Sequence, residues 1–137
     1  MKKALVALAV LLCANSAYAI SSKIIPIVGS STSRVSFTAD ATRSPVCIDS
    51  SEKELIFFLD ADYVSGSSTL DVKIQESWNA SDWKDLLAFT QVTTTDATEK
   101  VSINIGNSWR CYRAVIDVGA SGSPNYNVKV ILTTNPL

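Results

Sequence analysis

The sequence predicts an all-β fold, an antiparallel β-sandwich of immunoglobulin-like or jelly-roll-like type with eight or nine short strands and one disulfide. Apolar residues alternate with polar ones at a period of two, the pattern of strands that bury one face. Short runs of Gly, Ser and Asn separate these stretches, as turns do. Two cysteines, Cys47 and Cys111, lie beyond the N-terminal leader, and an even number in an exported chain indicates a disulfide.

The first 19 residues are typical of a secretory signal peptide. Lys2 and Lys3 precede an apolar stretch over residues 4–14, and Ala17-Tyr18-Ala19 forms a cleavage site. The apolar stretch is too short to span a bilayer of about 30 Å. We expect cleavage before Ile20, one domain over residues 20–137, a secreted or periplasmic location at or outside a bacterial cell surface, and no membrane insertion afterwards.

Nine stretches are predicted as strands: Ile24–Val28, Arg34–Thr38, Val46–Ile48, Leu55–Leu59, Leu70–Gln75, Phe89–Thr93, Lys100–Ile105, Arg110–Val118 and Asn127–Leu132. In Leu70–Gln75 and in Lys100–Ile105, every second residue is apolar, so one face of each should be buried. The segment Ser81–Leu87 is the one helix candidate, with Ser81 as its N-cap and room for one or two turns.

Cys111 stands between Arg110 and Arg113, so it is either a thiolate activated by cations or half of a disulfide with Cys47. Cys13 leaves with the signal peptide, and neither a base nor a reducing compartment is indicated, so we expect the disulfide. It would close a loop of about 65 residues, for which the chain-entropy model gives roughly 4 kcal/mol.

The apolar residues of the Arg110–Val118 strand alternate, and Cys111 falls on the other face from them. The disulfide should therefore tie Val46–Ile48 across an outer face or edge, although a bulge near Trp109 would reverse this assignment.

Composition excludes several function classes. The net charge is −1, and it becomes −3 when Lys2 and Lys3 leave, so no attraction to nucleic acid is expected. The chain has no histidine, the commonest general base and zinc ligand. Asp60 and Asp62 lie in no calcium-binding loop pattern, and we expect solvated turn carboxylates. We predict a non-enzymatic protein without cofactor or metal.

Two apolar features are candidates for an assembly surface. Leu55–Leu59 is apolar at every position, as in a strand covered on both faces or exposed at a contact surface. The N-terminal run could add a strand to a neighbouring subunit, although Pro26 suits an edge position. The predicted surface consists of Ile24, Ile25, Ile27, Val28, Ile56 and Phe58.

A loop with two tryptophans is the candidate contact for a ligand or partner, formed by Trp78, Asn79, Asp82 and Trp83. Exposed tryptophans stack on sugar rings, while an amide and a carboxylate bind hydroxyls. The alternative is that Trp83 closes one end of the sandwich.

Part of the chain resembles small β-sandwich structural and decoration proteins of tailed-phage virions and prophages. The resemblance covers about 65 residues of the C-terminal half and is carried by Gln75-Glu76-Ser77, Trp83, Phe89-Thr90-Gln91-Val92 and Tyr112-Arg113-Ala114. It implies a non-enzymatic structural module. The signal peptide and Cys111 depart from that pattern, and they suggest the same kind of sandwich used outside the cell.

We therefore expect an exported structural protein, a subunit or decoration module of an extracellular assembly or virion-like particle, with itself or other subunits as partners. The alternative is a secreted carbohydrate-binding or adhesion module that uses exposed tryptophans to bind a glycan.

Overall fold

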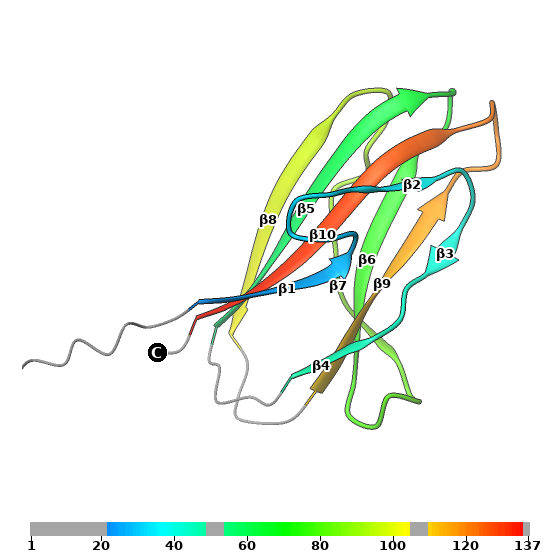
Figure 1. Cartoon of the computed structure of the whole chain (residues 1–137). Helices are drawn as coiled ribbons and strands as arrows, with labels where there is room; N and C mark the ends of the chain where they lie inside the picture. The colour runs from blue at the N-terminus through cyan, green and yellow to red at the C-terminus, as the bar shows by residue number, and fades with distance from the viewer. Residues whose placement is uncertain (1–21, 49–53, 105–109, 136–137) are drawn as a thin grey trace, which may run out of the picture.

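Two antiparallel five-stranded sheets stack as a β-sandwich in the computed structural model, which describes residues 22–48, 54–104 and 110–135 (Figure 1). Sheet A has the order β1-β10-β5-β8, with β2 also paired to β10. Sheet B has the order β3-β9-β6-β7, with β4 also paired to β9. The strands are β1 (Lys23–Val28), β2 (Val35–Phe37), β3 (Ala41–Thr42), β4 (Val46–Ile48), β5 (Glu54–Ser65), β6 (Leu70–Ser77), β7 (Lys84–Ala88), β8 (Ala97–Asn104), β9 (Arg110–Val118) and β10 (Asn125–Asn135).

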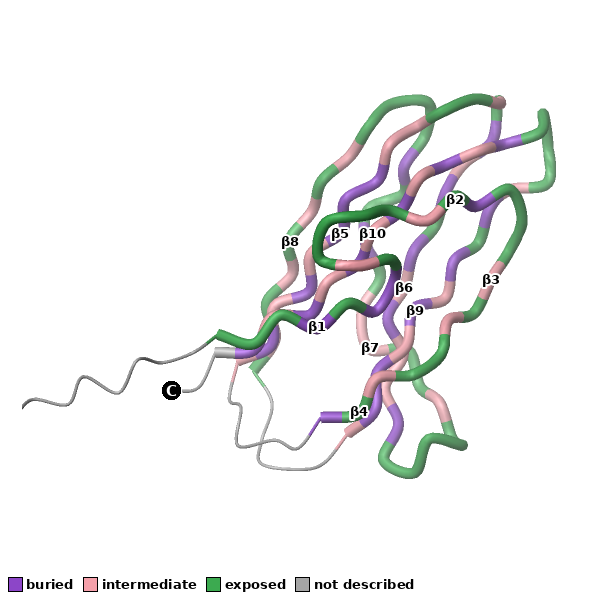
Figure 2. The backbone as a smooth tube through the Cα atoms, in the orientation of Figure 1, coloured by how far each residue is buried: buried purple, intermediate pink, exposed green. Residues whose placement is uncertain are grey.

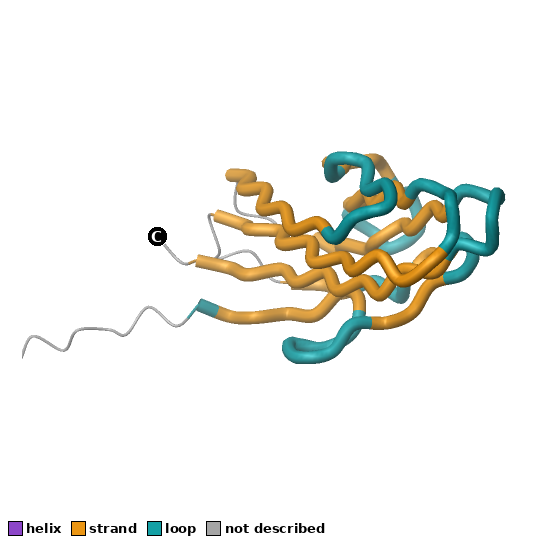
Figure 3. Tube along the Cα trace, turned by 90° about the horizontal axis from the view of Figure 1, so that it is seen from above, coloured by secondary structure: helices purple, strands orange, loops and turns teal. Residues whose placement is uncertain are grey.

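The predicted fold class, with its Cys47–Cys111 disulfide, is confirmed. The helix predicted over Ser81–Leu87 is wrong, because Lys84–Ala88 is strand β7, and the described residues form strands, turns and loops (Figure 3). The cause is tertiary: β7 pairs with β6, and Asp85 accepts hydrogen bonds from Lys73 at 2.9 Å and Gln75 at 2.7 Å.

Two further differences concern strand extents. The stretch Phe89–Thr93, predicted as a strand, is joined to β6 by an isolated bridge between Val92 and Leu70 and by a hydrogen bond from the Phe89 N–H to the Val72 carbonyl. The short strand β3 was not predicted. The signal peptide, Ile105 and Trp109 lie outside the described residues. Among the residues that the structure describes, no helix could span a membrane.

The core fills the space between the sheets, and burial alternates along the central strands (Figure 2). On β5, Leu55, Phe57 and Leu59 are fully buried, whereas Ile56 and Phe58 point to the outer face and are half-buried. Phe57 meets Tyr112 of β9 edge to face, with ring centroids 5.6 Å apart. This contact joins the two sheets.

Strand β1 is an edge strand that pairs only with β10, so Pro26 needs no second ladder partner, as predicted. Ile25, Ile27 and Val28 are buried in the core. This corrects their assignment to an assembly surface, because a side chain in the core cannot contact another subunit. The run is also already paired within its own sheet, so it is not free to be donated.

The disulfide lies within sheet B and does not cross the core. Cys47 of β4 and Cys111 of β9 are directly opposite each other, with Cα atoms 3.9 Å apart. Because Cys47 is exposed and β4 lies beside β9 outside the main strand order, the bond ties an edge segment to the sheet, as predicted.

A charge cluster on sheet A provides a pH test of stability. The expectation that Asp60 is a solvated turn carboxylate is wrong, because Asp60 lies in strand β5 and is only 7% exposed. It binds Arg34 at 2.8 Å and Lys129 at 3.0 Å. Burial raises the pKa of Asp60, but the hydrogen bonds from Arg34 and Lys129 outweigh burial and hold it below 3.8. A lowered folded-state pKa stabilises the protein above the unfolded pKa, and the stabilisation is lost as pH falls through the folded value.

We expect Asp60→Asn to lower the free energy of unfolding by about 2 kcal/mol at pH 7. The difference from the wild type should shrink as pH falls below the unfolded-state pKa of about 4 and then through the lower folded-state pKa. Urea unfolding at several pH values measures both effects. Asp62→Asn is the control, because Asp62 makes one ion pair, to Arg34 at 2.9 Å, and its side chain is 33% exposed. If the free energy of unfolding of Asp60→Asn stays below that of the wild type by the same amount at every pH, the stabilising role of the ionised Asp60 carboxylate would be contradicted.

Candidate functional site

The loop between β6 and β7 is held in one shape by Asn79. Its Oδ1 accepts hydrogen bonds from the backbone N–H groups of Ser81 at 2.9 Å and Asp82 at 2.8 Å. Its Nδ2 donates to Asp82 Oδ2 at 2.7 Å. Ala80 adopts a left-handed conformation with φ of 58°, which the surrounding hydrogen bonds impose. The side chain of Asn79 therefore uses its polar atoms to hold the loop, and its main role is structural.

Two tryptophan–arginine stacks fix the ends of this loop. The guanidinium carbon of Arg110 lies 4.3 Å from the ring centroid of Trp78, and that of Arg113 lies 4.2 Å from the ring centroid of Trp83. The two arginines are three residues apart on β9, so they project from opposite faces of sheet B. The tryptophans are consequently separated, and they do not form one continuous aromatic surface.

Both arginines are themselves anchored on β6. Arg110 donates to Glu76 Oε2, and Arg113 Nε donates to Gln75 Oε1 at 2.9 Å. A cation stacked on an aromatic face contributes roughly 0.5–2 kcal/mol, depending on exposure. Each tryptophan ring is thus held in a defined orientation.

Trp78 borders a surface hollow of about 290 Å³ that Glu76, Asn79, Asp82 and Lys84 also line. The indole is 59% exposed even though Arg110 covers part of it. The hollow thus combines one aromatic surface with an amide, an ammonium group and two carboxylates. Three of the four predicted contact residues meet here: Trp78, Asn79 and Asp82.

Trp83 does not line this hollow. It is half-buried and stacks on Arg113, so it belongs to the outer face of sheet B. Sequence analysis missed Glu76, Lys84 and Arg110. Glu76 could have been found, because it precedes Trp78 by two positions in an extended segment and shares its face. Lys84 was not considered as a contact residue because it was placed in the helix that was wrongly predicted over Ser81–Leu87.

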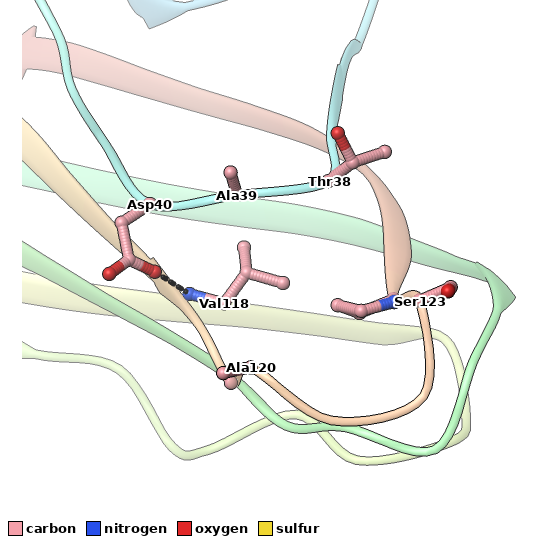
Figure 4. A pocket seen from close by; sticks show the side chains of 8 residues that line it. Thr38, Ala39, Asp40, Val118, Ala120 and Ser123 are labelled. Carbon is pink, nitrogen blue, oxygen red and sulfur yellow. Dashed lines mark hydrogen bonds between the residues drawn. The ribbon is translucent and has the colours of Figure 1, made fainter.

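A second hollow, of about 480 Å³, lies between the β2–β3 and β9–β10 connections (Figure 4). Small side chains line it, including Ala39, Ala120 and Ser123, and no aromatic residue does. Asp40 Oδ1 accepts the backbone N–H of Val118 at 2.8 Å, which fixes the connection to the end of β9. This hollow offers no stacking surface and contains a carboxylate that is used structurally.

Tyr112 is a buried titratable side chain beside Arg110 and Glu76. Burial raises the pKa of Tyr112 to about 12, with a smaller opposing effect of Arg110. The hydroxyl of Tyr112 has no hydrogen-bond partner in the described part of the chain. Within residues 22–48, 54–104 and 110–135, no three His, Cys, Asp or Glu side chains gather as a metal site would require.

No family model matches the sequence, and no curated protein matches it. Among solved structures, a chain described as "xylan-binding module CBM15" aligns with a TM-score of 0.47 and 13% sequence identity. The alignment covers 84% of this chain and 97% of that chain.

Proposed function

We propose that this protein is a glycan-binding module whose site is the hollow beside Trp78. The exposed indole is the observation that carries the proposal. Sugar rings present apolar C–H faces that pack on aromatic rings, and an exposed tryptophan that is held in place loses little entropy on binding. Arg110 supports Trp78 from one side, and 59% of the residue surface remains accessible.

The polar groups around the indole suit hydroxyl groups. Glu76 and Asp82 accept hydrogen bonds, and Lys84 donates them. Glu76 is paired with Arg110, and Asp82 accepts from Asn79, so both carboxylates are oriented before a ligand arrives. The charges of Glu76 and Asp82 are balanced by Lys84 and Arg110, which favours a neutral sugar over a strongly charged one.

Binding needs only that Glu76 and Asp82 accept hydrogen bonds. Each carboxylate has acceptor sites beyond the one used by Arg110 or Asn79. The leader sequence and the disulfide support an exported protein, so the ligand would be an extracellular glycan.

The test is calorimetric titration with xylohexaose, cellohexaose, laminarihexaose and chitohexaose. We expect at least one of these probes to bind, and Trp78→Ala to weaken that binding about 30-fold, as the loss of roughly 2 kcal/mol from a stacking residue implies. The ligand-induced change in tryptophan fluorescence should also disappear in Trp78→Ala.

Trp83→Phe is the matched control, because it alters an aromatic residue of the same loop outside the hollow. It should bind the same probe as the wild type does. Equal weakening by Trp83→Phe would move the site to the outer face of sheet B, and no binding of any probe would refute the proposal.

A second candidate function is a structural subunit of an extracellular assembly or virion-like particle. It is favoured by an apolar area on the outer face of sheet A, formed by Ile24, Ile56, Phe58 and Ile131. The resemblance to phage virion proteins supports the same candidate and stays a prediction.

A further inference from the structure

The outer faces of the two sheets differ in chemistry. On sheet B, the outward side chains of β6 and β9 include Asp71, Lys73, Gln75, Arg113 and Asp117, of which four are charged. On sheet A, Ile131 of β10 lies opposite Phe58 of β5, and in the next row Thr133 of β10 lies between Ile24 of β1 and Ile56 of β5. The four apolar residues are Ile24, Ile56, Phe58 and Ile131. These four residues are named the apolar face. Because a soluble sheet usually exposes polar residues on its outer side, the apolar face indicates a contact surface.

The apolar face has the layout of an interface core. It surrounds a hollow of about 330 Å³, which Lys100 and Thr133 also line. Further along the same face lies the charged group of Arg34, Asp60, Asp62 and Lys129, whose members are already paired with one another. Protein interfaces combine an apolar core with a polar rim in this way.

We propose that two copies of this chain associate through the outer face of sheet A. The hollow on the outer face of sheet A and the exposed side chain of Ile24 beside it suit a symmetric contact. Ile24 is 57% exposed on edge strand β1, beside the hollow bordered by Ile56 and Phe58. In a two-fold arrangement each copy places its Ile24 against the hollow of the other, because the same patch serves both partners.

The area of the face agrees with a reversible dimer. The four main strands of sheet A contain 6, 11, 12 and 8 residues. At about 3.4 Å per residue and 4.8 Å between strands, the whole outer face of sheet A measures roughly 30 by 20 Å, or about 600 Å² per copy. Two copies would bury roughly 1,200 Å², the lower end of the range for specific interfaces. This inference is independent of the glycan site, which lies at the β6–β7 loop.

Sedimentation velocity of the purified protein from about 1 to 500 µM tests the proposal. We expect a concentration-dependent monomer–dimer equilibrium. Ile24→Lys and Phe58→Lys should each raise the dissociation constant at least tenfold, since each would place a charge within the apolar contact. Thermal unfolding of each variant verifies that it is folded, and Ile24→Lys is the safer of the two because Ile24 lies on an exposed edge.

Trp78→Ala is the matched control, because it removes an exposed apolar side chain from the other site. It should dimerise as the wild type does, while Ile24→Lys should bind glycan probes as the wild type does. A wild-type protein that stays monomeric up to the highest concentration would overturn the proposal. A dimer that is unchanged in folded Ile24→Lys and Phe58→Lys would overturn it as well.

Discussion

Removal of the disulfide in Cys47→Ala/Cys111→Ala is expected to lower the free energy of unfolding by about 4 kcal/mol. The two cysteines are 64 residues apart in sequence, so the bond restricts a large loop in the unfolded chain. In the folded state, β4 has only three residues and pairs only with β9, which gives it little hold on the sheet besides the bond. Urea unfolding of the double variant and the wild type measures the difference.

The wild type in the presence of a reducing agent provides the control. It should lose nearly as much stability as the double variant, since both lack the same covalent link. A large loss in the double variant with little change in the reduced wild type would assign the effect to side-chain packing. A loss below about 1 kcal/mol in both would show that β4 detaches locally without affecting the remaining sandwich.

The sandwich could be predicted from the sequence because its main signal is local. Alternation along Leu70–Gln75 and Arg110–Val118 assigns their faces without knowledge of the partner strands, and the structure buries those faces. The pairing of Cys47 with Cys111 could be predicted because these are the only two cysteines after residue 19 in the sequence. The completely apolar Leu55–Leu59 segment indicated a strand that is covered on both faces or exposed at a contact surface. It belongs to β5, one of the two central strands of sheet A.

What the sequence could not predict depends on contacts between distant segments. Nothing local places Arg110 against Trp78 or Arg113 against Trp83, because those stacks arise from the pairing of β6 with β9. The helix prediction over Ser81–Leu87 failed for the same reason, since pairing with β6 outweighed local propensity. The bulge between Pro26 and Val28 turned Val28 inward, to the side on which alternation already places Ile25 and Ile27.

The contrast between Phe57 and Phe58 gives the sharpest test of the assigned faces of β5. Phe57 is fully buried and contacts Tyr112 across the sandwich, whereas its neighbour Phe58 lies on the outer face of sheet A. Truncating a buried phenylalanine removes its transfer free energy and leaves a cavity, which costs about 3–5 kcal/mol. We expect Phe57→Ala to lose stability in this range, measured by urea unfolding at a low protein concentration that keeps the chain monomeric.

Phe58→Ala is the matched control, since it makes the same chemical change one position along the same strand. At the same low concentration, it should cost about 1 kcal/mol or less, because a half-buried outer side chain leaves no closed cavity. At high concentration the deficit of Phe58→Ala relative to the wild type should grow, whereas that of Phe57→Ala should not, since only Phe58 contributes to the proposed contact between copies. Similar losses for both variants at low concentration would mean that the outer face of β5 is covered within the monomer, and the apolar face would then no longer be available to a second copy.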